Sequence, residues 1–329
     1  MLNKKIIITG AAGFIGLNLL NSIIKRKNLR LEIFAVDNLK TSNLLDFKQI
    51  LKANKFKKKK KFFYKNRIKI YFIKKSFAKL NNTKLKNLNN IDCLIHLAAQ
   101  TGVVQSMKYP EKDAEENIIN SIKLFQFLRD RKINKIIFAS SMGVLGDNLL
   151  SSNLSSHNPL NFYAASKSSV ENYLNVFKKT FGIKTFILRF SNIYGRFSKK
   201  KSSVIANFFK SIIKNRRVSI NGSGNQYRDF LYVDDLVEVI EKLSFSMKYD
   251  FLDKKPIHVA TGKSFNINQL VKIFRKDLGI KFKILKKKGS IGDIQKSFIK
   301  INEVKKLKKD FTSIKKGLKI TYQWYKKFY

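Results

Sequence analysis

Short apolar runs alternate with longer amphipathic stretches over the first half of the chain. The runs predict β-strands at residues 6–9, 31–36, 69–73, 93–97 and 135–139, and the stretches predict helices at 14–27 and 113–131. Strands that alternate with helices in this way are typical of βαβ units. The pattern therefore predicts an α/β protein with a doubly wound parallel sheet.

The second half alternates less regularly. Strands are expected at 185–190 and 229–233, and helices at 161–180, 203–215 and 234–244. We find neither a fixed-period repeat nor a linker rich in Pro, Gly and Ser. A chain of 329 residues exceeds most single compact domains, so a second lobe interlocked with the sheet is expected. Ligands of such sheets bind beyond the carboxyl ends of the strands.

The composition indicates a globular protein rather than a disordered one, since hydrophobic residues make up 44% and aromatic residues 12% of the chain. The net charge of +46 comes mainly from lysines scattered among Asn, Ile and Phe, as a compositional bias would place them. We find no recognition motif for nucleic acid and expect no such partner. The surplus charge would still attract diphosphate ligands. The densest run, at 57–61, is interpreted as a solvated surface without a function.

Cys93 is the single cysteine, so one chain can form neither a disulfide nor a cysteine-based metal site, and no metal is expected. No apolar stretch approaches the ~20 residues that cross a bilayer. The N-terminal apolar run is too short for the core of a signal peptide. We therefore expect a cytoplasmic protein that does not insert into membranes.

A glycine-rich turn follows the first strand and opens the first helix. Gly10 permits the tight turn, Gly13 lets the backbone approach a pyrophosphate, and Gly16 lets the helix pack closely on the sheet. Asp37 ends the second strand, where its carboxylate can accept hydrogen bonds from the ribose hydroxyls of a dinucleotide. This spacing predicts a dinucleotide site with a preference for NAD.

Tyr163 and Lys167 lie four residues apart in a predicted helix and therefore share one face. A free tyrosine has a pKa of roughly 10 and is a poor base at neutral pH. A lysine one turn away would stabilise the phenolate, so we expect a lowered pKa for Tyr163. Ser141, at the end of the strand at 135–139, completes a candidate catalytic set.

Together these motifs resemble the extended short-chain dehydrogenase/reductase family, and within it the NAD-dependent nucleotide-sugar epimerase/dehydratase group that includes UDP-glucose 4-epimerases. The resemblance covers nearly the whole chain. The matching segments are 10–16, Asp37-Asn38-Leu39, His96-Leu97-Ala98-Ala99, Asn117, Ser140-Ser141, 163–167, 188–195 and 228–234.

The resemblance implies a Rossmann domain at 1–184, with returning segments near 185–195 and 229–262, and a smaller nucleotide-sugar lobe at 196–228 and 263–329. It implies that Tyr163 exchanges a proton with the sugar 4-hydroxyl, that Ser141 binds the same oxygen, and that Lys167 binds the nicotinamide ribose. The implied NAD-binding residues are Gly10, Gly13, Phe14, Ile15, Gly16, Asp37, Asn38, Leu97, Ala98, Ala99, Tyr163 and Lys167. The implied substrate-binding residues are Ser141, Asn192, Arg228 and Asp293.

The chain departs from the family pattern at three places. Lys75-Ser76-Phe77 stands where relatives carry an acidic residue for the adenine, and Val144-Leu145-Gly146 replaces the usual Val-Tyr-Gly. The arginine expected shortly before Gly292-Asp293 is missing, with Lys288 as a stand-in.

The two residues after Ser141 bear on the reaction. Related dehydratases place Asp-Glu there and related decarboxylases a Glu, whereas this chain has Met142 and Gly143, which cannot transfer a proton. Epimerisation at C4 through a 4-keto intermediate is therefore the leading interpretation. A 4-keto-sugar reductase or dehydratase, and a nucleotide-binding protein without turnover, remain alternatives.

Family members pair two helices across a twofold axis. The corresponding helices here, at 113–131 and 161–180, carry apolar residues on more than one face. A buried core would explain this too, but we expect a homodimer.

Overall fold

The structure is a computed structural model that describes residues 3–26, 29–82, 88–146, 157–287 and 301–329. Its centre is a nine-stranded sheet. In chain order the strands are β1 (Asn3–Thr9), β2 (Arg30–Val36), β3 (Lys57–Lys58), β4 (Phe63–Lys65), β5 (Ile68–Ile73), β6 (Cys93–His96), β7 (Lys135–Ser141), β8 (Lys184–Phe190) and β12 (Ile257–Val259). In space they lie in the order β12-β8-β7-β6-β1-β2-β5-β4-β3. All are parallel except β4 and β3, which complete one edge as antiparallel strands.

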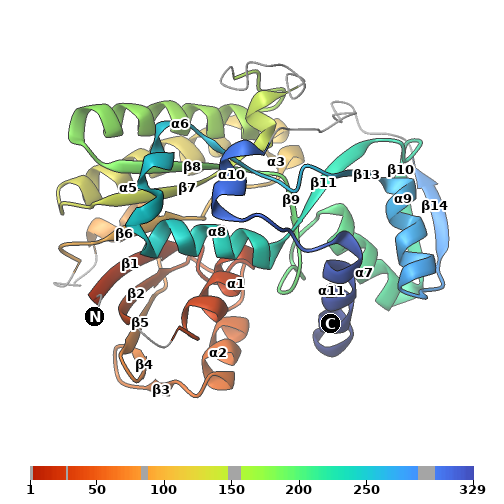
Figure 1. Ribbon diagram of the computed structural model, residues 1–329, viewed down its shortest axis with the longest axis horizontal. Helices are drawn as coiled ribbons and strands as arrows, with labels where there is room; N and C mark the ends of the chain where they lie inside the picture. The colour runs from red at the N-terminus through yellow and green to blue at the C-terminus, as the bar shows by residue number, and fades with distance from the viewer. Residues whose placement is uncertain (1–2, 27–28, 83–87, 147–156, 288–300) are drawn as a thin grey trace.

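Helices cover both faces of the sheet, because its strands are apolar on both sides. In β1, Ile6 and Ile8 pack into one hydrophobic core and Ile7 into the other. The first core includes residues of α1 (Phe14–Ile23), α2 (Leu44–Ala53) and α8 (Val233–Phe245); the second includes residues of η1 (Phe77–Asn82), α5 (Asn120–Arg129) and α6 (Phe162–Phe181). The predicted doubly wound parallel sheet is thereby confirmed (Figure 1).

The helix predicted at 113–131 begins earlier and is interrupted. Its first segment, α4 (Pro110–Ala114), starts at Pro110, since proline is accepted in the first helical turn. A π-helical turn, η2 (Glu115–Ile119), then leads into α5. Such turns often lie at functional sites, and this one contains Asn117.

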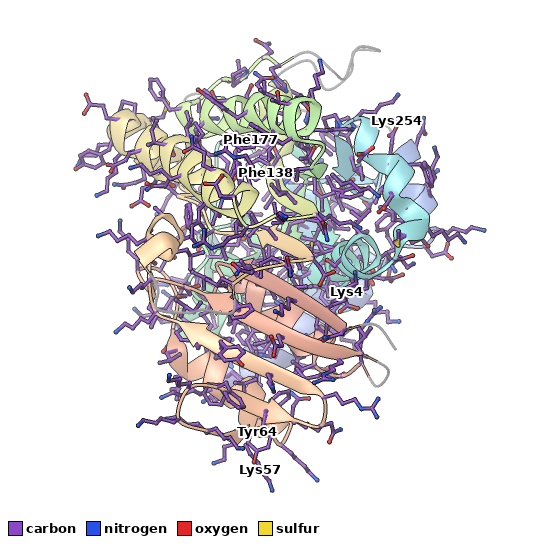
Figure 2. All side chains as sticks on the ribbon, turned by 90° about the vertical axis from the view of Figure 1, so that its left-hand side faces the viewer. Lys4, Lys57, Tyr64, Phe138, Phe177 and Lys254 are labelled. Carbon is purple, nitrogen blue, oxygen red and sulfur yellow. The ribbon has the colours of Figure 1, made fainter. Side chains whose placement is uncertain are left out.

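The segment 48–66, for which no element was predicted, contains the second half of α2 and the β3–β4 hairpin. The five lysines at 57–61 are all exposed. Figure 2 shows Lys57 and Tyr64 together at one end of the molecule. Lysines on an edge strand discourage pairing with a second sheet, which gives this run a structural role.

The remaining described elements are two small sheets and a further set of helices. One sheet has the order β13 (Ser264–Asn266), β11 (Tyr227–Tyr232), β9 (Asn192–Tyr194), and the other pairs β10 (Arg217–Asn221) with β14 (Lys283–Lys287). The helices are α3 (Val103–Lys108), η3 (Met142–Leu145), α7 (Val204–Asn215), η5 (Met247–Lys254), α9 (Ile267–Lys272), η6 (Ile273–Asp277), α10 (Asn302–Leu307) and α11 (Ile314–Phe328). Figure 1 shows α7, α9, α11, β10 and β14 gathered at one end. The exact division into two lobes stays a prediction.

In the described part of the chain, no helix has both the length and the apolar character that crossing a bilayer requires.

Candidate active site

The chain order of the strands reverses between β1 and β6, which is where doubly wound sheets bind ligands. The Thr9 hydroxyl, at the end of β1, hydrogen-bonds His96 Nδ1 at 2.7 Å and accepts from Ala98 N at 3.2 Å. Burial lowers the pKa of His96 to about 3, so its ring is neutral. These contacts fix the loop of Leu97, Ala98 and Ala99, predicted to line the dinucleotide site.

The glycine turn fits a dinucleotide pyrophosphate. Gly10 has φ +68°, and a Cβ there would lie 2.9 Å from a backbone nitrogen of the loop after β6. A Cβ on Gly16 would lie 2.2 Å from the carbonyl oxygen of Gly10, so the helix can approach only without a side chain. Gly13 caps α1 without a side-chain hydrogen bond. The N–H groups that open α1, at Phe14 and Ile15, are thus available to an anion.

Asp37 joins this turn to the loop after β2. Its Oδ2 accepts from Ala12 N at 2.9 Å, and its Oδ1 accepts from Leu39 N at 2.8 Å and from the Ser42 hydroxyl at 2.6 Å. A carboxylate has about four acceptor positions, so one remains for a ribose hydroxyl. Asn38 is exposed beside it.

The structure brings Ser141, Tyr163 and Lys167 together. Ser141 ends β7, and its Oγ accepts a hydrogen bond from Gly143 N at 3.1 Å. The Ser141 hydroxyl also acts on the side chain of Tyr163, whose pKa it lowers. Lys167 is 3% exposed, and its Nζ lies 6.0 Å from the centroid of the Tyr163 ring. A hydroxyl, a phenol and an ammonium group therefore form one cluster.

The expected lowering of the Tyr163 pKa is wrong for this structure. Burial and the charge of Asp113 raise it to about 12, and the Ser141 hydroxyl opposes them only in part. Burial likewise lowers the pKa of Lys167 to about 8, although Asp113 and Glu171 act against that effect. The helical spacing showed the lysine but not the carboxylate on α4.

Asn117, matched to the family without an assigned role, connects three elements of the site. Its Oδ1 accepts from Gln100 N at 2.8 Å, and its Nδ2 contacts the Ser166 hydroxyl at 3.1 Å and Asp113 Oδ1 at 3.2 Å. Sequence reasoning did not identify Asp113, which is 1% exposed. The only signal in the sequence was an acidic residue at a core-facing position.

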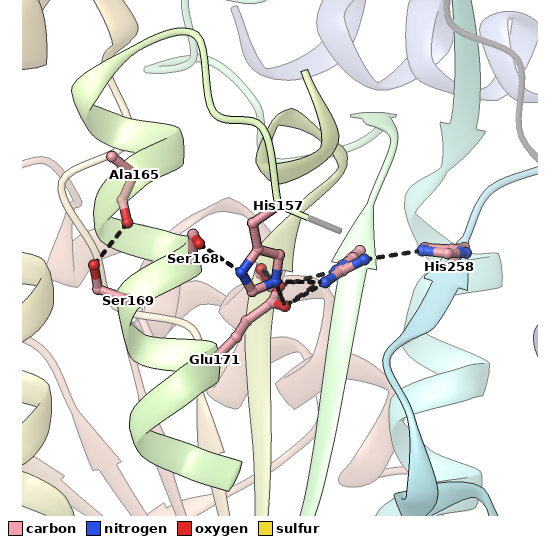
Figure 3. A network of polar contacts seen from close by, with 8 residues as sticks. His157, Ala165, Ser168, Ser169, Glu171 and His258 are labelled. Atoms are coloured by element: carbon pink, nitrogen blue, oxygen red, sulfur yellow. Dashed lines mark hydrogen bonds and ion pairs between the residues drawn. The ribbon is translucent and has the colours of Figure 1, made fainter. Parts of the chain in front are cut away.

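A buried ion pair supports the end of β7. Glu171, one turn after Lys167, bonds Arg189 through Nη2 at 2.6 Å and His157 through Nε2 at 3.0 Å (Figure 3). It also accepts a hydrogen bond from Ser140, the neighbour of Ser141. Burial alone would raise the pKa of Glu171, but the bonds from His157 and Arg189 hold it below its ordinary value.

Two of the predicted substrate residues share a cavity of about 570 Å³, a volume typical of small-molecule sites. Asn192 on β9 and Arg228 on β11 line it, and Asn192 Nδ2 donates to Asp229 O at 3.3 Å. Sequence reasoning missed its polar residues from α7, β10 and the loop before β11, which include Asn207, Ser219, Asn221 and Gln226. Asp293 lies outside the described residues.

In the described ranges, no group of three or more His, Cys, Asp and Glu side chains is placed to hold a metal ion.

Comparison with known proteins places these features in a family. Over 98% of both chains, the sequence is 29% identical to a Methanocaldococcus jannaschii protein provisionally named UDP-glucose 4-epimerase. The fold is similar to the UDP-N-acetylglucosamine 4-epimerase of Methanobrevibacter ruminantium M1, with a TM-score of 0.83, 28% identity and 99% coverage of both chains.

The UDP-glucuronic acid 4-epimerase of Bacillus cereus, solved with UDP-glucuronic acid and NAD, is also similar, with a TM-score of 0.84, 25% identity and coverage of 99% of this chain and 100% of that one. The NAD dependent epimerase/dehydratase family model matches residues 6–245. The predicted family and its NAD cofactor are thereby confirmed: the chain belongs to the NAD dependent epimerase/dehydratase family.

Proposed function

We propose that this protein epimerises a nucleotide-diphosphate sugar at C4, in the manner of a UDP-glucose 4-epimerase. The observation that carries the proposal is the cluster of Ser141, Tyr163 and Lys167. Ser141 ends β7, which neighbours β6 in the sheet, and the two residues after Ser141 carry no proton-transfer group.

Tyr163 would take the proton of the sugar 4-hydroxyl, and Ser141 would hold the same oxygen by a hydrogen bond. Lys167 would bind the nicotinamide ribose and hold a positive charge near the phenol. NAD, when bound, supplies the acceptor for the hydride of C4. Tyr163 would return the proton to the 4-oxygen of the rotated 4-keto sugar when the hydride goes back to the opposite face of C4, so no cofactor would be consumed overall.

The residues after Ser141 favour epimerisation over dehydration. Met142 is 7% exposed and apolar, and a Cβ added to Gly143 would lie 3.4 Å from Ser141 Oγ. Neither position offers an acid or base for chemistry at C5 and C6. Asp113 is a carboxylate in the same cluster, which keeps a dehydratase or reductase as the alternative.

A UDP sugar is the proposed substrate. The cavity joins Arg228, which suits a diphosphate, to the amide side chains of Asn192, Asn207 and Gln226, which suit a pyrimidine base and a ribose. The similar proteins are named for UDP-glucose, UDP-N-acetylglucosamine and UDP-glucuronic acid, so the hexose remains to be found by experiment.

We also propose a homodimer formed through the surface of η2 and α6. Ile119, Tyr173, Val176 and Phe181 are apolar or aromatic and between 45% and 58% exposed there. Pairing this surface with a second copy would remove it from water. Light scattering should give twice the chain mass for the wild type and a single chain mass for V176E; a monomeric wild type would refute the dimer.

Incubation of the purified protein with UDP-, dTDP- and GDP-hexoses, with products resolved by NMR, tests the proposed activity. The proposal expects the C4 epimer of one or more UDP sugars. A 6-deoxy-4-keto product would indicate a dehydratase. No product from any substrate would favour a nucleotide-binding protein without turnover.

A further inference from the structure

Lys201 lies where the glycine turn meets β9. Its Nζ is 5.0 Å from the centroid of the Phe14 ring and donates to Ile193 O at 3.3 Å. Phe14 is the first residue of α1, and Ile193 lines the large cavity. One lysine therefore lies between the two places where a phosphate group would bind.

The ammonium group of Lys201 has no acidic partner among the described residues. Burial lowers its pKa to about 8, with no carboxylate to oppose the effect. A cation held against a ring and a neutral carbonyl is poorly compensated for its lost hydration. The two preceding lysines have other partners: Lys199 lies 5.3 Å from the Trp324 ring centroid, and Lys200 Nζ donates to Ser42 O at 2.7 Å.

We propose that Lys201 binds an oxygen of a diphosphate, from either the dinucleotide at the glycine turn or the nucleotide sugar in the cavity. The uncapped N–H groups of α1 already favour an anion beside Phe14, and a nearby ammonium group adds a charge-assisted hydrogen bond. The nucleotide-sugar source rests on the proposed function, whereas the dinucleotide source does not.

A bound diphosphate would raise the pKa of Lys201, since an anion stabilises the charged amine. Near pH 8, where about half of the Lys201 amine is unprotonated, binding should therefore take up a fraction of a proton. At about pH 6 the amine is already charged, and the uptake should vanish.

Calorimetric titration of cofactor-free protein with NAD and, separately, with UDP tests the proposal. Titrations in two buffers of different ionisation enthalpy give the number of protons taken up. K201M should bind the relevant ligand about tenfold more weakly or worse and lose the uptake near pH 8. K201R should retain most of the affinity, and K199M, which removes a lysine over a ring in the same segment, should match the wild type.

Weaker binding of NAD alone supports the proposal and assigns Lys201 to the dinucleotide; weaker binding of UDP alone supports it and assigns Lys201 to the nucleotide sugar. Unchanged affinity and uptake with both ligands would overturn it. If K201M does not fold, wild-type titrations without proton uptake near pH 8 would also overturn it. A wild type that binds NAD but not UDP contradicts the proposed function, while the NAD titrations still decide the role of Lys201.

Discussion

Asp113 Oδ1 accepts a hydrogen bond from Asn117 Nδ2 at 3.2 Å, while its Oδ2 is buried without a hydrogen-bond partner in the described structure. This carboxylate raises the pKa of both Tyr163 and Lys167. In D113N both pKa values should fall. The acidic limb of the pH profile of kcat/KM should then move to lower pH by roughly half to one unit.

The alkaline limb of D113N should move in the same direction, because Asp113 raises the pKa of both Tyr163 and Lys167. The other charged group that acts on Lys167, Glu171, and the neutral ring of His96 are unchanged in this variant. D130N, at the exposed end of α5, is the control and should leave both limbs in place. A uniform loss of activity without a shift would mean that Asp113 is only structural.

Y163F should reduce turnover by about a hundredfold or more, the scale of losing a positioned acid or base. Binding of the nucleotide sugar should be nearly unchanged, because only a hydroxyl is lost. Y329F, which alters an exposed tyrosine after α11, is the control and should keep wild-type activity. Retained turnover in Y163F would remove Tyr163 from the mechanism.

Local patterns predicted the sheet and most of the catalytic cluster. The helical spacing placed Tyr163 and Lys167 on one face, and Ser141 was expected just after a strand, but grouping the three as one set also needed the dinucleotide fingerprint. Asp113 could not be placed in this way, since its effect depends on how α4 packs against α6 and on a π turn that periodicity does not show.

The small strands were also beyond the sequence pattern. β9, β12 and β13 have three residues each, too few to show an alternation. Strand β11 was expected from its apolar run, but its partners β9 and β13 are set by tertiary contacts. The cavity that β9 and β11 line could therefore be predicted only at Asn192 and Arg228, through the family resemblance.

E171Q should destabilise the fold by about 3–5 kcal/mol at neutral pH, because it removes the carboxylate that pairs with the buried charge of Arg189. The pKa of Glu171 lies below its ordinary value of 4.5, so its contribution is complete above that pH and disappears as the pH falls further. Urea unfolding at neutral and acidic pH should therefore show that the free energy of unfolding of E171Q differs less from that of the wild type as the pH falls.

The matched control is E238Q, whose carboxylate is 41% exposed and pairs with Lys242 and Lys308. It should change stability by no more than about 1 kcal/mol. If E171Q lost as little stability as this control, the buried network would not support the fold.

The protein should bind NAD about tenfold or more tightly than NADP. Asp37 would place a negative charge beside a 2′-phosphate, and two of the nearby cations are already engaged: Lys40 pairs with Glu116 at 3.3 Å and Arg26 with Glu241 at 3.0 Å. Fluorescence titration of the cofactor-free protein measures both affinities. Equal affinities for NAD and NADP would show that the basic residues near the site outweigh the repulsion from Asp37.

The central claim is that hydride leaves and returns within one catalytic cycle. The direct test follows a UDP sugar by NMR, and reduced nicotinamide by absorbance, in one reaction supplied with catalytic NAD. We expect the C4 epimer to accumulate to equilibrium while the absorbance of reduced nicotinamide shows no net change proportional to product. Stoichiometric oxidation or reduction of the cofactor, or a product that keeps its C4 configuration, would contradict it.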